Sequence, residues 1–288
     1  MTVGGTSGIG ETTLKAFARH AISPRIYVVG RSQESYDRIS NEVKAINADA
    51  QLTFLPADCS ELREVDKVCN EVTKLEGAIQ KETNEPQLNF LVLTPLLDAA
   101  SSSDRPSRVI SVLGAGREGD IDLNDLDLKS NFSVSNCAKY CCTMNTLAVE
   151  ELAKKHPGTA YIHTSPGAVQ TNYLRSVDKW YTKPLIGALS VLIKPWETGF
   201  DECGERHLAV GLSGMEKWVA RKDRELFKDC EAGIDGEKGS GAYAVGPKSE
   251  FVGNGVALKK LRSEGAGAKV MEHTWKTFEQ VGKLNAAR

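Results

Sequence analysis

The sequence predicts a doubly wound α/β domain, in which helices cover both faces of a parallel sheet. Short β-branched runs recur along the chain, amphipathic helical patterns separate them, and the first run ends in the glycine-rich turn Val3-Gly4-Gly5-Thr6-Ser7-Gly8-Ile9-Gly10. Continuous apolar strands that alternate with helices are typical of parallel sheets buried on both faces. We expect residues 1–288 to form one domain of this Rossmann type, with residues 172–240 as a variable region within it.

The glycine-rich turn is expected to join the first strand to the first helix. Leu14, Phe17 and Ala18 follow it on one face of a helical pattern. A turn that approaches a pyrophosphate needs residues without a Cβ, because the phosphates then rest on the free N–H groups at the helix start. The spacing G-x-x-x-G-x-G alone also fits a plain connector, but its place after the first strand of such a sheet favours a dinucleotide site.

The remaining elements follow from hydrophobic periodicity. The longest helix should end at His156-Pro157-Gly158, and the residues expected on its buried face are Cys137, Cys141, Met144, Ala148 and Leu152. Strands are expected at 26–29, 52–55, 90–93, 109–112, 160–163 and 242–245, and helices at 36–46, 62–75, 136–155, 202–210 and 270–281. Residues 211–239 are polar and are expected to form a surface excursion.

Composition excludes several classes of protein. A net charge of -2 argues against a nucleic-acid partner, and the longest apolar run, residues 185–193, is too short for an integral membrane segment. The seven cysteines contain no C-x-x-C pair, so a zinc site is not expected. No secretory segment precedes the first strand, and we therefore expect a cytoplasmic protein with reduced thiols.

Three segments together resemble the short-chain dehydrogenase/reductase family. They are the glycine-rich turn, the step Ala57-Asp58-Cys59 after the third strand, and Ser165-Pro166-Gly167-Ala168-Val169-Gln170-Thr171 after a later strand. The resemblance runs from residue 2 to about residue 171. It is nearest to divergent fungal members found beside biosynthetic gene clusters, which implies a role in secondary metabolism.

The resemblance implies where a nicotinamide dinucleotide would bind. Asp58 would accept a hydrogen bond from the adenine amino group, although an Asp at this position also suits a helix N-cap. Val169 and Thr171 would contact the nicotinamide carboxamide. The residues implied to hold the phosphates are Gly4, Ser7, Gly8, Ile9 and Gly10.

The tip of the second strand bears on the choice of cofactor. It reads Gly30-Arg31-Ser32, whereas enzymes selective for NAD usually carry an acid there for the ribose hydroxyls. The guanidinium of Arg31 and the hydroxyl of Ser32 suit a 2′-phosphate, so we predict NADP over NAD. An exposed arginine is also often merely solvated.

The chain departs from the family where the chemistry takes place. The family uses Y-x-x-x-K on the long helix, where the tyrosine exchanges a proton with the substrate and the lysine lowers its pKa. Lys139 has the lysine position, but Ser135 stands where the tyrosine is expected, and its hydroxyl is a poor replacement. Tyr140 is turned by about 100° from Lys139 and should face the core or the neighbouring strand.

The other members of the usual catalytic set are also missing. The family's serine after the fifth strand falls at Leu113 or Gly114, while Ser111 lies earlier, within the strand. The turn after the fourth strand reads Leu93-Thr94-Pro95-Leu96, without the usual asparagine. Without these partners, Lys139 is as well explained as a solvated helix lysine as by a catalytic role.

Two regions are shorter than the family pattern. Only Met1-Thr2-Val3 precede the glycine-rich turn, and residues 95–107 are barely enough for the crossover between the fourth and fifth strands. We expect an abbreviated first strand, a shortened crossover and a chain truncated relative to a longer reductase. In the family, the crossover between the fourth and fifth strands often supports subunit pairing, so the oligomeric state, including a homo-oligomer, is left undecided.

These observations support two functions. The first is an NADP-dependent oxidoreductase that transfers hydride to or from a carbonyl or alcohol of an apolar small molecule, for which the aromatic residues between 173 and 196 are suited. The alternative is a catalytically impaired relative that binds a dinucleotide or acts as a scaffold. The altered positions Ser135, Leu113 and Gly114 motivate this alternative.

Overall fold

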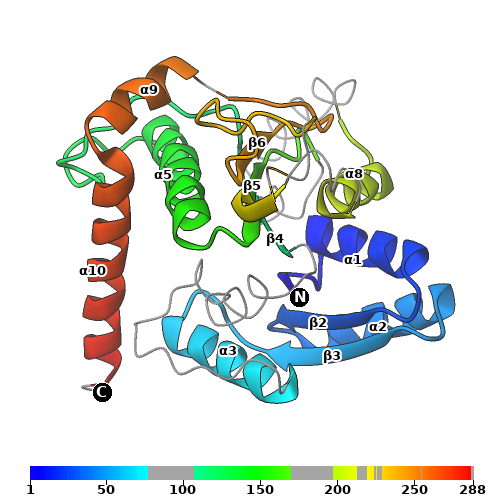
Figure 1. Ribbon diagram of the computed structural model, residues 1–288. Helices are drawn as coiled ribbons and strands as arrows, with labels where there is room; N and C mark the ends of the chain where they lie inside the picture. Colours follow the sequence, from blue (N-terminus) through cyan, green and yellow to red (C-terminus); the bar gives the residue numbers. More distant parts are fainter. Residues whose placement is uncertain are drawn as a thin grey trace, which may run out of the picture. The chain divides into compact units, whose positions relative to one another are not determined.

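The computed structural model describes residues 1–76, 107–169, 197–212, 219–223, 225, 229–253 and 255–286. The chain divides into two compact units, Met1–Cys59 with Pro166–Val210, and Ser60–Ser165 with Gly211–Arg288. Each unit contains a three-stranded parallel sheet with flanking helices (Figure 1). This arrangement confirms the predicted Rossmann-type α/β class.

The sheet of the first unit has the order β1-β2-β3, with β1 at Thr2–Val3, β2 at Arg25–Gly30 and β3 at Gln51–Pro56. Helices α1 (Gly8–His20) and α2 (Gln33–Ile46) connect these strands. Their apolar faces pack with β2 in one core cluster, whose buried members are Leu14, Ala18, Ile26, Val28, Ile39, Val43 and Ala50. The two-residue β1 confirms the abbreviated first strand.

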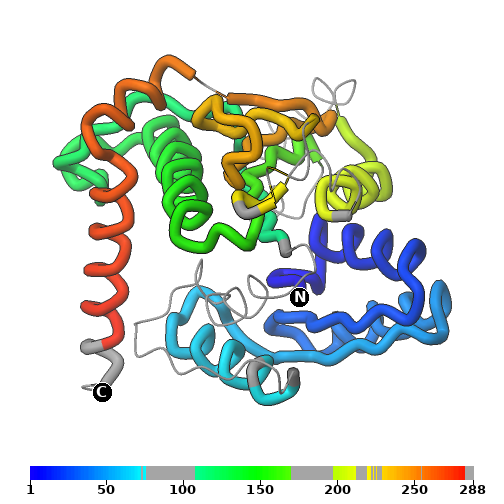
Figure 2. Tube along the Cα trace, in the orientation of Figure 1, coloured from blue at the N-terminus to red at the C-terminus, as the bar shows by residue number. Residues whose placement is uncertain are grey.

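The sheet of the second unit has the order β4-β5-β6, with β4 at Ser107–Val112, β5 at Thr159–Thr164 and β6 at Ala242–Val245. Helix α5 (Val134–Lys155) packs against β5 and β6. Helix α10 (Ala266–Ala286) packs against α5, α9 (Gly255–Ser263) and α3 (Leu62–Glu76), and Figure 2 traces α10 in red beside the green α5.

Most expected elements in the described residues are present. Strand β6 has the predicted bounds, and α5 ends at Lys155 with His156 as its C-cap. Helix α8 (Phe200–Leu212) extends the predicted helix at both ends. Helix α9 was not predicted, because only Leu258 and Leu261 mark its buried face. The expected strand at 90–93 and most of the shortened crossover lie outside the described residues.

The prediction of which residues of the long helix are buried is wrong in part. Leu152 is buried as expected, but Cys141 is exposed. The buried residues of α5 are Tyr140, Cys142, Thr143, Thr146, Leu147, Val149, Glu150, Leu152 and Ala153. Periodicity of apolar residues missed this face because several of its side chains are polar and are buried with hydrogen-bond partners.

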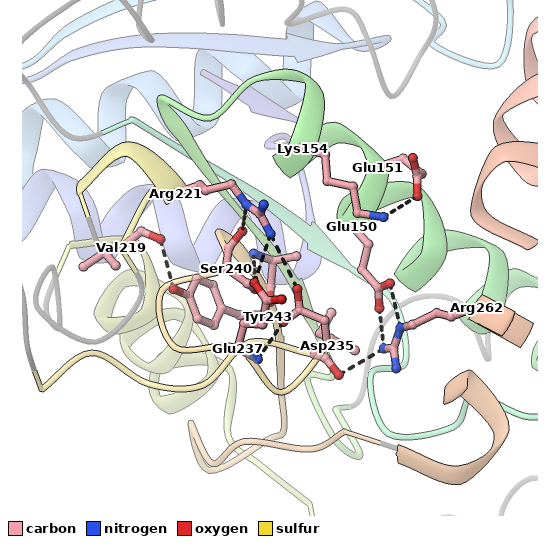
Figure 3. Close-up of polar contacts among 12 residues, drawn as sticks. Glu150, Glu151, Lys154, Val219, Arg221, Asp235, Glu237, Ser240, Tyr243 and Arg262 are labelled. Atoms are coloured by element: carbon pink, nitrogen blue, oxygen red, sulfur yellow. Dashed lines mark hydrogen bonds and ion pairs between the residues drawn. The ribbon is translucent and has the colours of Figure 1, made fainter. Parts of the chain in front are cut away.

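The expected surface excursion is also more buried than its polarity suggested. Val219, Cys230 and Ile234 are all buried, and Ile234 belongs to the main core cluster of the second unit. Tyr243 of β6 donates a hydrogen bond from its hydroxyl to the carbonyl of Val219 at 3.0 Å, which ties the segment to the sheet (Figure 3). No helix within the described residues is long and apolar enough to span a membrane.

A buried ion pair joins α5 to α9 (Figure 3). Glu150 is 4% exposed, and both of its carboxylate oxygens accept hydrogen bonds from Arg262, at 3.0 and 2.6 Å. Arg262 also donates to the carbonyl of Ile234 at 3.0 Å. A charge with this little access to water depends on its partner, because it cannot be rehydrated when the partner is removed.

We expect Arg262→Met to lower the free energy of unfolding by about 3 kcal/mol, because it leaves the buried Glu150 carboxylate unpaired. Lys154→Met is the matched control, since Lys154 forms an exposed ion pair with Glu151 one turn away on the same helix. It should cost less than about 1 kcal/mol. Urea unfolding of both variants measures the difference, and equal losses would contradict the prediction.

Candidate functional site

The turn after β1 has a backbone that only glycine fits at several positions. Gly4 and Gly8 have φ values of +75° and +58°, in the left-handed region that disfavours side chains. A Cβ on Gly10 would lie 2.6 Å from the carbonyl oxygen of Gly4, which is backbone and cannot move aside. The Gly4 N–H donates to the carbonyl of Val29 at 3.0 Å, which fixes the turn to β2.

Helix α1 begins inside this turn, with its N-terminal amides available for an anion. Ser7 is the N-cap, and its side chain makes no capping hydrogen bond. The hydroxyl of Ser7 and the amides of Gly8, Ile9 and Gly10 are therefore suited to bind oxygen atoms of a phosphate. Backbone strain at Gly4 and Gly8 and backbone contact at Gly10 exclude side chains from this turn. A pyrophosphate can therefore approach its backbone closely, and the turn fits such a group.

Arg31 and Asp58 follow the neighbouring strands β2 and β3 at the same edge of the sheet. Arg31 Nη1 lies 3.7 Å from Asp58 Oδ2, and the arginine side chain is 78% exposed. Ser32 is the N-cap of α2 and accepts a hydrogen bond from the Ser35 N–H at 3.1 Å. The structure thus brings together the two side chains that sequence reasoning assigned to adenine and to the 2′-phosphate.

Glu11, in the first turn of α1, takes part in a ring of four alternating charges. Its carboxylate accepts two hydrogen bonds of 2.8 Å from Arg38 and one of 2.6 Å from Lys15, and both cations also pair with Glu42 of α2. Arg38 lowers the pKa of Glu11, burial opposes this effect, and Lys15 lowers the pKa further. The ring neutralises a carboxylate that would otherwise repel an anion at this helix end.

In the second unit, the loop after β4 offers no side-chain donor where the family has its serine. Leu113 is 47% exposed, and the N–H of Gly114 donates to Nε2 of His163 at 3.1 Å. Ser111 lies within β4, as predicted, and its hydroxyl donates to Asn145 Oδ1 of α5 at 3.1 Å. Ser111 is therefore engaged inside the unit and does not replace the missing serine.

Helix α5 carries the two predicted catalytic residues on successive turns. Ser135 is exposed near the N-terminus of the helix, after the N-cap Ser133. The aliphatic part of Lys139 lies against Gly119, where a Cβ would come within 2.8 Å of its Cδ. Tyr140 is buried, and its hydroxyl oxygen accepts the N–H of Asp122 at 2.8 Å, so the prediction that it faces the core is confirmed.

The motif after β5 is described only in part. The N–H of Ser165 donates to the carbonyl of Val245 at 2.8 Å, and Gly167 has a φ of +76°. Ala168 forms a parallel bridge with Glu197. Val169 is the last described residue of the motif, and Thr171 lies outside the described residues. The assignment of these residues to the carboxamide stays a prediction.

Sequence reasoning missed a group of buried polar residues behind the loop that follows β4. Glu118, Thr146 and His163 are all buried and hydrogen-bonded to one another. The available signal was polarity at apolar positions, since His163 ends a run expected to be a buried strand.

An open groove of about 340 Å³ between residues 123–129 and α10 contains none of the predicted site residues.

Comparison with known proteins places the chain in a family. No protein-family model matches it. Oxidoreductase AN1596 of Emericella nidulans is 34% identical over 317 residues, which covers 96% of this chain and 92% of that protein. The short-chain dehydrogenase/reductase SAT2 of Stachybotrys chartarum is 26% identical over 327 residues, with 98% of this chain and 92% of that protein covered. The chain belongs to the short-chain dehydrogenase/reductase family.

Solved structures show the same short-chain dehydrogenase/reductase fold. L-sorbose reductase of Gluconobacter frateurii, complexed with NADPH and L-sorbose, has a TM-score of 0.56 at 13% identity and covers 86% of this chain and 94% of its own. NADPH-bound carbonyl reductase from chicken fatty liver has a TM-score of 0.54 at 15% identity, with 88% and 97% covered. At these identities the similarity concerns the fold.

Gly10→Ala tests the backbone contact in the turn. We expect it to lower the free energy of unfolding by about 1–3 kcal/mol, because the added methyl group must displace the Gly4 carbonyl. Gly282→Ala is the control, since no heavy atom lies within 4 Å of the corresponding Cβ. It should stabilise α10 by about 0.5–1 kcal/mol. Thermal unfolding distinguishes the two, and a neutral Gly10→Ala would contradict the described turn.

The charge ring predicts a pH dependence of stability. Because the folded-state pKa of Glu11 is lowered, its contribution is present above the ordinary glutamate pKa of about 4.3 and is lost as the pH falls through the lowered folded value. Arg38→Gln should therefore lose less stability than the wild type between pH 7 and pH 3. Arg63→Gln, which alters an exposed pair with Glu61, should behave as the wild type.

Proposed function

We propose that this chain is an NADP-dependent oxidoreductase that transfers hydride between the cofactor and a carbonyl or alcohol group of an apolar small molecule. The observation that carries this proposal is the turn after β1, where glycine backbone and the start of α1 form a cradle for a pyrophosphate. Family membership and the NADPH named for similar reductase structures support it.

The described residues would divide the binding of the cofactor among them. Gly4, Ser7, Gly8, Ile9 and Gly10 would hold the phosphates, and Asp58 the adenine. Arg31 and Ser32 would bind the 2′-phosphate, which supports NADP over NAD. The bound cofactor would supply the hydride, and Lys139 would contact the nicotinamide ribose. A role in secondary metabolism is proposed from the fungal oxidoreductases among the relatives.

A second candidate is a dinucleotide-binding protein with impaired catalysis. It is favoured by the exposed Ser135 at the tyrosine position and by Leu113 and Gly114, which provide no side-chain hydroxyl. In both cases we propose a cytoplasmic protein, because all seven cysteines are free thiols. The two candidates agree on cofactor binding and differ only in turnover.

Titration of protein fluorescence with NADPH and NADH tests cofactor binding, which both candidates share. We expect the wild type to bind NADPH more tightly than NADH. Arg31→Ala should lower the affinity for NADPH by about tenfold and change the affinity for NADH by less than about twofold, because only NADPH carries the 2′-phosphate. Lys44→Ala, at the exposed end of α2, is the control. Tighter binding of NADH by the wild type would contradict the cofactor preference.

Turnover decides between the enzyme and the impaired relative. NADPH oxidation is measured with a panel of apolar ketones, aldehydes, enones and 9,10-phenanthrenequinone. Activity of the wild type with any of them supports the oxidoreductase, whereas NADPH binding without oxidation supports the second candidate. Ser135→Tyr restores the family's proton donor, and a large gain in rate would show that the rest of the site is complete.

A further inference from the structure

A chain of hydrogen bonds links the interior of the second unit to the loop after β4. Thr146 and His163 have no exposed surface, and Glu118 is 5% exposed. Thr146 Oγ1 lies 2.7 Å from Glu118 Oε1 and 2.8 Å from His163 Nδ1. At the loop, the Gly114 N–H donates to His163 Nε2 at 3.1 Å, and the Gly116 N–H donates to Glu118 Oε2 at 2.9 Å.

The geometry assigns the protons along this chain. A backbone N–H can only donate, so Nε2 of His163 must be unprotonated to accept from Gly114. The single hydroxyl proton of Thr146 is donated to Glu118, so its oxygen can only accept from His163. The proton of His163 is therefore on Nδ1, and the imidazole is neutral.

The ionised form of Glu118 agrees with this assignment. Burial raises the pKa of its carboxyl group, whereas His163, whose Nδ1 lies 3.5 Å from Glu118 Oε1, Thr146 and the backbone lower it. An ionised carboxylate has no proton to give, so both of its oxygens accept. The directions of all four hydrogen bonds are then mutually consistent.

The chain of hydrogen bonds constrains the loop at several points. It holds the amides of Gly114 and Gly116, and the side chain of Thr143 hydrogen-bonds to both the N–H and the carbonyl of Gly119. Buried polar groups are costly when they lose a partner, so the loop has little freedom to adopt another conformation. This loop begins where the family's serine is expected.

We propose that His163 is a positioning residue, which as a neutral imidazole protonated on Nδ1 holds the amide of Gly114 and so fixes the loop from Leu113 to Gly119 for the reaction. The significance of the loop for the reaction rests on the proposed function. The tautomer and the hold on Gly114 do not, and they can be tested separately.

Two substitutions test the two ring nitrogens of His163 separately. In His163→Gln the side-chain oxygen can reach the place of Nε2 and accept from Gly114, whereas in His163→Asn the shorter amide reaches only the place of Nδ1. We expect amide hydrogen exchange in peptides covering residues 113–119 to be about tenfold faster in His163→Asn than in His163→Gln, because one hydrogen bond is lost from the loop. Equal exchange in both variants would overturn the proposal.

The tautomer is measured on the wild-type protein, so this test does not depend on a variant that folds. In ¹⁵N-labelled protein, the His163 signals, assigned by their loss in His163→Gln or, should that variant not fold, by sequential assignment, should show a protonated Nδ1 and an unprotonated Nε2 at pH 7. The reverse tautomer or a doubly protonated ring would overturn the proposal.

Steady-state kinetics with NADPH and 9,10-phenanthrenequinone test the functional consequence. His163→Asn should lower kcat about tenfold, with KM for NADPH changed less than twofold, and His163→Gln should retain most of the activity. A similar loss in both variants would show a purely structural role. Failure of the wild type to bind NADPH would overturn the proposed function. Amide hydrogen exchange and the tautomer of His163 would still decide whether His163 positions the loop.

Discussion

The close approach of backbone to backbone in the turn after β1 is the constraint on which the proposed cofactor site depends. The chain passes from β1 to α1 within a few residues, and Gly10 lies so close to the carbonyl of Gly4 that a methyl group has no room. Ser7, the N-cap of α1, makes no side-chain capping hydrogen bond to the first amides of the helix. An anion with several oxygen atoms can then be bound by main-chain groups alone.

Electrostatics in the first unit is arranged around the same helix end. A carboxylate in the first turn of a helix is favourable for the helix dipole but unfavourable beside a phosphate. The ring formed by Glu11, Arg38, Lys15 and Glu42 reconciles these requirements, because it keeps Glu11 ionised and cancels its charge. The ring also ties α1 to α2.

The second unit relies on buried polar groups to a degree that its apolar pattern does not suggest. Glu150 is paired with Arg262, and Glu118 is hydrogen-bonded through Thr146 to His163. Such groups gain stability only when each partner is in place, so they specify one arrangement of α5, α9 and the loop after β4. The loop after β4 is thus held by buried side chains at Gly114 and Gly116.

The sequence by itself determined the fold class, most element positions and the glycine-rich turn before α1, because apolar periodicity and glycine spacing are local properties. It also located Tyr140 in the core from helical geometry alone. Only the tertiary structure decided that Arg31 lies beside Asp58, that Thr146 links His163 to Glu118, and that the polar segment around Ile234 joins the core. These features depend on contacts between residues far apart in the chain, for which a single sequence carries no periodic signal.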